Sequence, residues 1–287
     1  MSDILGGSAG RVVLADNLEV LATLPDGCVD LVYVDPPFNT GTRRTMSRLR
    51  TVRDESGDRT GFGGHRYRSI KVGSAEYLDI HDDYLAFLAP RLEEIRRVLA
   101  ATGSLYLHLD PREVHYAKVL ADSIFGRECF LNEIVWAYDF GGRPRDRWPA
   151  KHDDILVYVK DPVRHWFDRD AVERIPYMAP GLVGPEKAAR GKLPTDTWWQ
   201  TIVPTSGGER TGYPTQKPLA ILRRIVSASC PPGGLVGDFF AGSGTAGAAA
   251  AELGRRFLLV DSNPQAFEMM RARLGGLPGV VFEPTSA

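Results

Sequence analysis

The last third of the chain alternates helix-like and strand-like segments, and this alternation limits the possible folds more than any other feature. Residues 218–229, 244–253 and 264–274 are helix-like, the first beginning at a proline. Between them, residues 235–240 and 256–261 are short apolar runs of the kind that form buried strands. Strands that alternate with helices predict an α/β fold, with a mostly parallel sheet and helices on both faces.

The first half of the chain continues this pattern. Further strands are predicted over residues 11–15, 29–34, 103–109, 133–138 and 155–159, with a last one over 280–282. Helices are predicted over residues 84–99 and 112–125, and Pro90 is expected to kink the first of them or to begin a second helix. With 287 residues, the chain can form one large α/β domain or such a core with a small insertion.

Two segments interrupt the alternation. Residues 42–73 follow the strand at 29–34 and are rich in arginine and glycine, so we expect a long, mobile, cationic loop that orders on a polyanion. From residue 40 to residue 71, eight arginines and one lysine face three acidic residues, a net charge of +6. Residues 161–211 carry prolines, glycines and aromatics without a clear period, which indicates an insertion on the core.

Composition excludes several classes of protein. The chain has 43% hydrophobic and 25% charged residues, as expected for a globular protein in solution. It has no apolar run of membrane-spanning length and no signal-peptide pattern, which predicts an intracellular protein. The three cysteines are scattered, so neither a disulfide framework nor a metal site is predicted. A net charge of −1 argues against a protein that coats nucleic acid by bulk charge.

The strand at 29–34 ends in Asp35-Pro36-Pro37-Phe38, which suits the binding of a flat ring that carries an amine. The carboxylate of Asp35 and a backbone carbonyl can accept from the amine, and Phe38 can stack on the ring. Two prolines remove backbone donors and leave carbonyl acceptors. Taken alone, the stretch is equally consistent with an ordinary turn after a strand.

A second motif, residues 238–245, lies between a predicted strand and a predicted helix and reads Asp-Phe-Phe-Ala-Gly-Ser-Gly-Thr. Gly242 and Gly244 permit a tight turn and the close approach of a ligand. Asp261 ends the next strand, where an acid can accept from ribose hydroxyls. An acid at position 238 is a poor neighbour for pyrophosphate and a good one for an α-amino group, which favours S-adenosylmethionine over a nicotinamide dinucleotide.

The two motifs together resemble the amino-methylating DNA methyltransferases of bacterial restriction–modification systems. Residues 35–41 resemble the catalytic motif, residues 238–245 the S-adenosylmethionine loop, residues 215–218 (Thr-Gln-Lys-Pro) the segment that precedes it, and residues 103–110 a core strand. The catalytic motif comes first, which is the circularly permuted order of the family's beta group. The resemblance covers most of the chain, except residues 42–73 and 161–190.

The resemblance implies a Rossmann-like class I methyltransferase that flips a base out of duplex DNA and transfers a methyl group to it. Residues 1–160 would be the catalytic half, 161–211 a target-recognition insertion and 212–287 the cofactor half. The implied catalytic residues are Asp35, Pro36, Pro37 and Phe38. The implied cofactor-binding residues are Asp16, Asn17, Lys217, Pro218, Asp238, Phe239, Ala241, Gly242, Ser243, Gly244, Thr245 and Asp261.

For Asp16 and Asn17, an N-cap of the following helix is an equally good interpretation. Within the family that the chain resembles, Asp rather than Ser at position 35 implies adenine N6 rather than cytosine N4 as the target amine, although the same arrangement fits either base. A DNA-binding relative without activity and a nucleotide-dependent oxidoreductase are the alternatives from other classes.

The expected partner is double-stranded DNA. The residues expected to contact its phosphates are Arg43, Arg44, Arg48, Arg143 and Arg145. The resemblance also implies a bacterial cytoplasmic enzyme that associates with the nucleoid when bound to DNA, a homodimer, and a cognate restriction endonuclease.

Overall fold

The structure is a computed structural model, and it describes residues 6–37, 42–53, 59–60, 66–79, 83–204 and 207–284. For the three segments between residues 42 and 79 the description is of the backbone. Phe38, the last residue of the predicted catalytic motif, lies outside the described residues, and so do the side chains of Arg43, Arg44 and Arg48. Among the helices of the described ranges, none combines the length and apolar character needed to cross a membrane.

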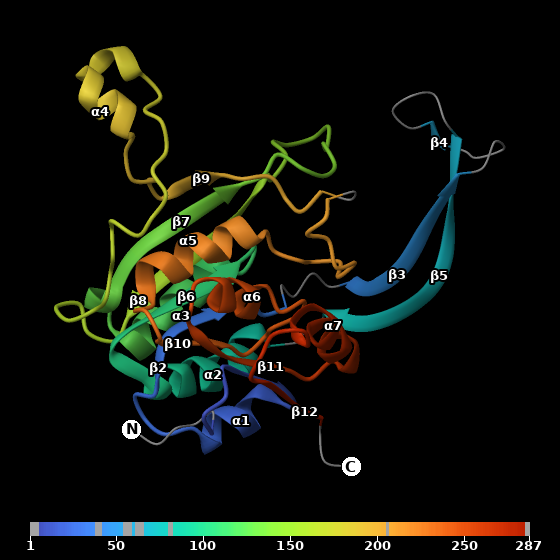
Figure 1. The fold of residues 1–287 in the computed structure, drawn as a ribbon, viewed down its shortest axis with the longest axis horizontal. Coiled ribbons are helices and arrows are strands. Elements are labelled where there is room, and N and C mark those ends of the chain that lie inside the picture. Colours follow the sequence, from blue (N-terminus) through green and yellow to red (C-terminus); the bar gives the residue numbers. More distant parts are fainter. Residues whose placement is uncertain are drawn as a thin grey trace.

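A nine-stranded sheet forms the centre of the described part of the chain (Figure 1). Its order is β12-β1-β11-β10-β2-β6-β8-β7-β9, parallel from β12 to β6 and between β7 and β9, with β8 antiparallel to β6 and β7. The strands are β1 (Gly10–Leu14), β2 (Val29–Val34), β6 (Leu99–Leu109), β7 (Phe130–Ala137), β8 (His152–Val159), β9 (Thr197–Trp199), β10 (Leu235–Asp238), β11 (Arg256–Asp261) and β12 (Val280–Glu283). The predicted mostly parallel sheet is confirmed.

Helices cover both faces of this sheet. One face packs against α1 (Asn17–Thr23), α2 (Tyr84–Val98) and α3 (Val114–Phe125), and the other against α5 (Leu219–Ser229), α6 (Thr245–Glu252) and α7 (Pro264–Leu274). The short helix α4 (Pro185–Arg190) and the 3-10 turns η1 (Arg127–Cys129) and η2 (Pro180–Leu182) complete the described helices. The central strands are buried on both faces, which is why β11 and the second half of β8 read as unbroken apolar runs.

The expectation of a loop over residues 42–73 is wrong. The backbone forms β3 (Thr42–Arg53) and β5 (Arg66–Asp79), which pair antiparallel, with β4 (Arg59–Thr60) beside β5. This hairpin extends away from the rest of the molecule (Figure 1). Residues 48–51 alternate charged with apolar or hydroxyl-bearing side chains, as do residues 66–69. That period of two specifies strands, and the high density of arginine obscured it.

Two other segments differ from expectation. Pro90 does not begin a second helix, because a single helix runs through it from an N-cap at Asp83, whose carboxylate accepts from Ala86 N at 2.9 Å. The alternative expectation, a kink at Pro90, stays a prediction. Within residues 161–211, β9 joins the central sheet beside β7, so this segment is partly built into the core. The rest of it carries α4 on a protrusion (Figure 1).

The order of the strands places a crevice between β10 and β2. The chain leaves β2 through α2 toward β6, whereas it leaves β10 through α6 toward β11, on the other face and in the other direction. In open α/β sheets, ligands bind outside the carboxyl ends of the strands where the order reverses in this way. Asp238 ends β10 and Asp35 follows β2, so both predicted motifs meet at this point.

Candidate functional site

A pocket opens at the carboxyl ends of β2 and β10. It joins the end of β2, the segment that precedes α5, and the loop between β10 and α6. The residues that line it are Tyr33, Asp35, Tyr213, Thr215, Lys217, Asp238, Phe240, Ala241, Gly242, Ser243, Thr245 and Ala246. The fold therefore brings together three motifs that lie up to about two hundred residues apart in the sequence.

Asp35 is held at the pocket by Lys217. The ammonium of Lys217 donates to Oδ2 of Asp35 at 2.5 Å, and both side chains are largely buried. The other carboxylate oxygen, Oδ1, is buried and accepts no hydrogen bond within the part of the chain that the structure describes. A buried acceptor of this kind costs free energy unless a donor reaches it. The pocket thus presents an acceptor that a bound amine would satisfy.

Asp238 lies at the base of the same pocket and is 3% exposed. Its Oδ1 accepts from the backbone nitrogen of Phe240 at 3.0 Å. Burial, followed by the negative charges of Asp35 and Asp261, raises the pKa of Asp238 well above its usual value. Carboxylates gathered in one crevice make a site that favours cationic groups.

The loop after β10 is shaped by its glycines and fastened by Asp261. Gly242 and Gly244 have φ values of +50° and +71°, which glycine adopts without strain. A Cβ on Gly242 would lie 3.0 Å from the ring of Tyr213, so a side chain at this position would press on the pocket wall. Oδ2 of Asp261 accepts from Gly242 N at 2.8 Å, which fixes the turn.

Replacing Gly244 by alanine should destabilise this loop. The left-handed conformation costs a residue with a Cβ about 1–2 kcal/mol, and the new atom would lie 2.9 Å from Cγ of Met270. We expect chemical denaturation to show a free energy of unfolding lower by ~1–2 kcal/mol. Gly181→Ala is the control, because that position has an ordinary φ and open space around it. Equal stability of the two variants would contradict the argument.

Half of the predicted cofactor residues line the pocket and half lie behind it. Lys217, Asp238, Ala241, Gly242, Ser243 and Thr245 line it. Pro218 precedes α5, Gly244 begins α6, and Phe239 is a core residue that is 1% exposed. Asp261 uses its two oxygens for the backbone nitrogens of Gly242 and Asn263. Its predicted contact with ribose stays a prediction.

Asp16 and Asn17 support the loop from the far side. Asp16 caps α1, accepting from Leu18 N at 2.8 Å, as the alternative interpretation expected. Asn17 donates to the carbonyl of Phe239 at 2.8 Å and accepts from Arg91 at the same distance. These contacts anchor the segment that carries Asp238 and Phe240. Contact between Asp16 and a cofactor adenine stays a prediction.

Five residues of the pocket were not among the predicted site residues: Tyr33, Tyr213, Thr215, Phe240 and Ala246. Tyr33 lies two positions before Asp35 on the same strand, so the strand period could have identified it as a neighbour on the same face. Tyr213 lies in an irregular segment that carries no periodic signal.

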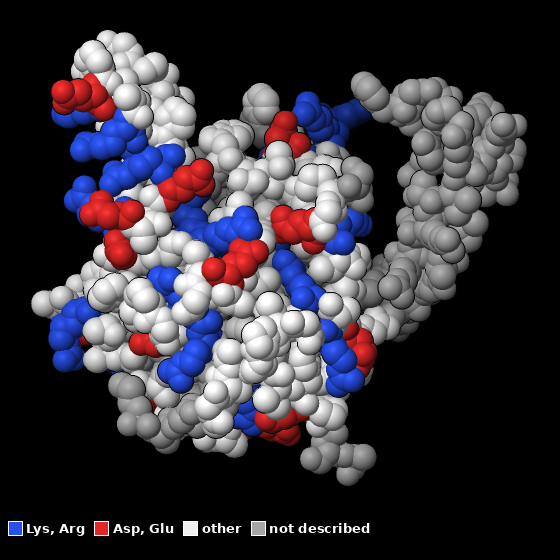
Figure 2. Space-filling view, viewed as in Figure 1, with Lys and Arg blue, Asp and Glu red and all other residues white. Residues whose placement is uncertain are grey.

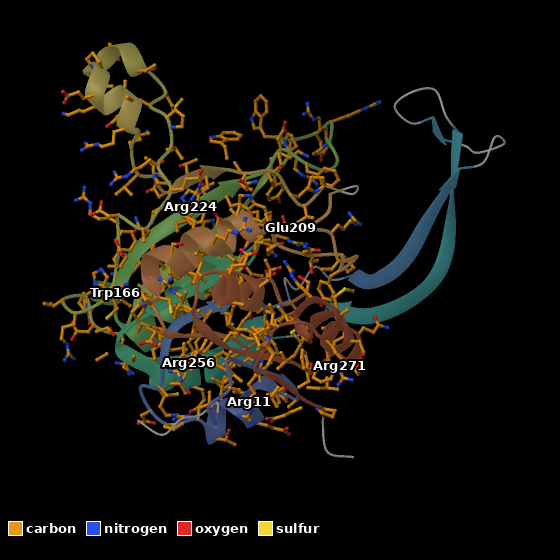
Figure 3. All side chains as sticks on the ribbon, viewed as in Figure 1. Arg11, Trp166, Glu209, Arg224, Arg256 and Arg271 are labelled. Carbon is orange, nitrogen blue, oxygen red and sulfur yellow. The ribbon has the colours of Figure 1, made fainter. Side chains whose placement is uncertain are left out.

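Glu209, labelled in Figure 3, lies in the segment that precedes α5. Its carboxylate accepts from Leu219 N at 2.6 Å, which anchors the start of that helix beneath Lys217.

The pocket fits S-adenosylmethionine in its chemistry. Buried carboxylates suit a ligand that carries an ammonium and a sulfonium, and the turn with two left-handed glycines admits a close approach to the backbone. The hydroxyls of Ser243 and Thr245 add polar contacts. For the pyrophosphate of a dinucleotide, the same carboxylates would be repulsive.

Comparisons with known proteins agree with this site. A family model described as DNA methylase matches residues 29–272. A DNA adenine methyltransferase of Escherichia coli K12, YhdJ, is 29% identical over 277 residues, covering 94% of this chain and 84% of that protein. The type II methyltransferase M.HpaI of Haemophilus parainfluenzae is also 29% identical, covering 92% and 74%. The solved M1.HpyAVI–SAM complex superposes with a TM-score of 0.58 at 20% identity, covering 92% and 98%, which shows a common fold.

Proposed function

This chain belongs to the DNA methylase family, and we propose that it transfers a methyl group from S-adenosylmethionine to N6 of adenine in double-stranded DNA. The observation that carries the proposal is the meeting of Asp35 with the glycine loop in one pocket. An unpartnered acceptor and a cofactor loop share a crevice there. The adenine methyltransferase relatives support the choice of base.

Asp35 prepares the target amine for attack. The lone pair of an exocyclic amine is conjugated with the ring, so the nitrogen is a weak nucleophile. Oδ1 of Asp35 would accept one amine hydrogen and the carbonyl of Pro36 the other, which draws the nitrogen toward a tetrahedral geometry. Lys217 fixes the carboxylate through Oδ2. Positioning and electrostatic stabilisation then supply most of the catalysis.

The target base must leave the helix to reach this pocket, because the amine inside a duplex is not accessible to it. Phe38 is proposed to stack on the extruded base. Stacking on an aromatic ring contributes about 1–3 kcal/mol, comparable with the few kcal/mol that unstacking costs. The cofactor supplies an electrophilic methyl group, and Asp238 and the glycine loop would hold its amino acid end.

We propose that DNA phosphates contact the loop over residues 139–151. This loop joins β7 to β8 at the same sheet edge as Asp35, since Ala137 pairs with His152 and Asp154 with Leu109. Lys151 donates to the carbonyls of Phe140, Gly141 and Gly142 at 2.7–3.0 Å and so holds the loop at its base. Arg143 and Arg145 are exposed on it.

The charge distribution suggests a second contact region. Lysine and arginine side chains gather on the protrusion that carries α4 (Figure 2). We propose that residues 161–211 read the target sequence through this protrusion. Exchanging them with the equivalent segment of a relative with a known target sequence should transfer that specificity.

Removing the arginines of the loop should weaken DNA binding in a way that depends on salt. Each phosphate contact contributes a slope of about −0.9 in log K against log salt. The double variant Arg143→Ala, Arg145→Ala should therefore lose about two units of slope, measured by fluorescence anisotropy. Arg127→Ala is the control, because its exposed side chain precedes β7 at the opposite sheet edge. An unchanged slope in the double variant would exclude these contacts.

Further partners are proposals that follow from the family resemblance. A homodimer is expected and would be seen by sedimentation velocity at micromolar concentration. A cognate restriction endonuclease is expected if the methylated sequence protects DNA from cleavage in the host. These expectations are independent of the chemistry in the pocket.

The test of the proposal is transfer of radiolabel. The protein with tritiated S-adenosylmethionine should label duplex DNA, and calorimetry should detect binding of the cofactor and not of NAD. Cofactor binding without label in DNA of varied sequence would favour a relative that only binds DNA. Binding of NAD alone would favour an oxidoreductase.

A further inference from the structure

A chain of buried hydrogen bonds leads away from the pocket into the sheet. The hydroxyl of Tyr33 lies 2.7 Å from Nδ1 of His108, and Nε2 of His108 lies 3.2 Å from Oδ2 of Asp153. The hydroxyl of Tyr138 lies 3.1 Å from Oδ1 of Asp153. Tyr33 is 2% exposed and His108 is fully buried. Strands β2, β6, β8 and the end of β7 each contribute one member.

The chemistry of these groups fixes the direction of the hydrogen bonds. Burial acts to raise the pKa of Asp153, but its interactions with His108, Lys217 and Tyr138 together outweigh it, and the pKa is lowered. Asp153 is therefore an ionised acceptor. In the neutral imidazole of His108, the hydrogen on Nε2 is shared with Asp153, and Nδ1 then has a lone pair. Tyr33 consequently donates its hydroxyl hydrogen to His108.

This direction determines what Tyr33 can offer to the pocket. Its hydroxyl hydrogen is engaged with His108, so the oxygen can act toward a ligand only as an acceptor. Burial and then the negative charge of Asp35 raise the pKa of Tyr33, which keeps it a neutral phenol. Tyr33 lines the pocket together with Asp35 and Lys217. A neutral phenol, a histidine and a carboxylate in this order can pass a proton inward.

We propose that Tyr33 receives the proton that the target amine loses, and that His108 and Asp153 are positioning residues for this step. The inference rests on the proposed methyl transfer. When the amine nitrogen bonds to the methyl carbon, the carbon–sulfur bond breaks and the positive charge moves from sulfur to nitrogen. One proton then passes from nitrogen to the oxygen of Tyr33, while the phenol proton moves to Nδ1 of His108. The resulting imidazolium is held by the carboxylate of Asp153.

Tyr33, His108 and Asp153 together form a proton relay, and their surroundings explain why the relay, and not Asp35, takes the proton. Asp35 is bound to the Lys217 ammonium through Oδ2, and its other oxygen would be occupied in holding the amine. The titratable groups around the relay are Asp35 and Lys217 at the pocket, Asp238 at the end of β10 and Asp153 with Tyr138 at its far end. The edge of the Trp136 ring packs on His108, with the two ring centroids 5.5 Å apart.

Single-turnover methyl transfer in the Tyr33→Phe variant tests the relay. The substitution keeps the ring and removes the oxygen, so we expect binding of S-adenosylmethionine close to that of the wild type and a lower melting temperature, because the buried Nδ1 of His108 loses its donor. The rate of transfer should fall by about 100-fold, the order of a general base contribution. The loss should appear in the rate of transfer at saturating DNA and not in the affinity for duplex DNA.

Asp153→Asn gives an independent test through the histidine. An amide at this position favours the other tautomer of His108, which cannot accept from Tyr33, so the same loss of rate is expected. Tyr138→Phe is the control, because it removes a hydrogen bond to Asp153 and leaves the relay intact. If Tyr33→Phe or Asp153→Asn transfers methyl within threefold of the rate of the wild type, the relay is wrong. If the wild type transfers no methyl to DNA, the proposed function fails instead.

Discussion

Replacing Asp35 by asparagine should slow methyl transfer by about 1000-fold while S-adenosylmethionine still binds. In the variant, the amide oxygen would turn to the ammonium of Lys217, which donates to Oδ2 in the wild type. The amide nitrogen would then replace Oδ1 and face the target amine, donor against donor. The buried acceptor that activates the amine is lost, although the size of the side chain is unchanged.

Single-turnover kinetics at saturating cofactor measure this effect directly. Asp30→Asn is the matched control, because Asp30 lies at the start of the same strand, about 17 Å from Asp35 along an extended chain. Its carboxylate accepts from Leu235 N at 2.8 Å, a contact that an amide oxygen can keep. A rate for Asp35→Asn within tenfold of the rate of the wild type would show that Asp35 does not activate the target amine.

Replacing Asp238 by asparagine should weaken binding of S-adenosylmethionine by about 10-fold to 100-fold, the value of a hydrogen bond to a charged group. The same change should stabilise the fold at neutral pH. The amide oxygen can still accept from Phe240 N, and the buried negative charge disappears. Asp238 would then lower the stability of the fold and at the same time strengthen binding of the cofactor.

The pH dependence of this second effect follows from the direction of the shift. Burial raises the pKa of Asp238 in the folded chain, so the folded state holds its proton more tightly than the unfolded state does. The stability that Asp238 contributes is therefore lost as the pH rises from its pKa in the unfolded chain toward its pKa in the folded chain. Melting temperatures from pH 4 to 8 should show a growing advantage of Asp238→Asn.

Asp26→Asn controls for loss of a surface charge, since that carboxylate is 80% exposed and an ion pair such as its contact with Arg97 contributes little in solvent. Its melting temperature should follow the wild type across the range. A difference between Asp238→Asn and the wild type that stays constant with pH would show that the Asp238 carboxylate does not carry the stability effect.

Most of the fold could be predicted from the sequence, because strands buried on both faces appear as unbroken apolar runs. Residues 256–261 and 264–274 were predicted with the bounds that β11 and α7 have in the structure. The hairpin of β3 and β5 was missed because its alternation combines arginine with small or apolar residues, and charge dominated the interpretation. Strand β9 was missed because three residues are too short for a period.

The site could be predicted only where a motif is contiguous. Asp35 and Asp238 were identified from their positions after strands, and the structure places both in one pocket. The partner of Asp35 could not be identified, because Lys217 lies 182 positions away and its contact depends on how the segment before α5 crosses the sheet. His108 and Asp153 likewise come together only through the pairing of β6 with β8.

Nucleoside analysis of methylated DNA tests the central claim most directly. Duplex DNA treated with the protein and S-adenosylmethionine would be digested to nucleosides and examined by mass spectrometry, with Asp35→Asn treated in parallel. The account predicts N6-methyldeoxyadenosine in the wild-type sample and background levels in the variant. N4-methyldeoxycytidine in place of the adenine product, or equal methylation by the variant, would contradict it.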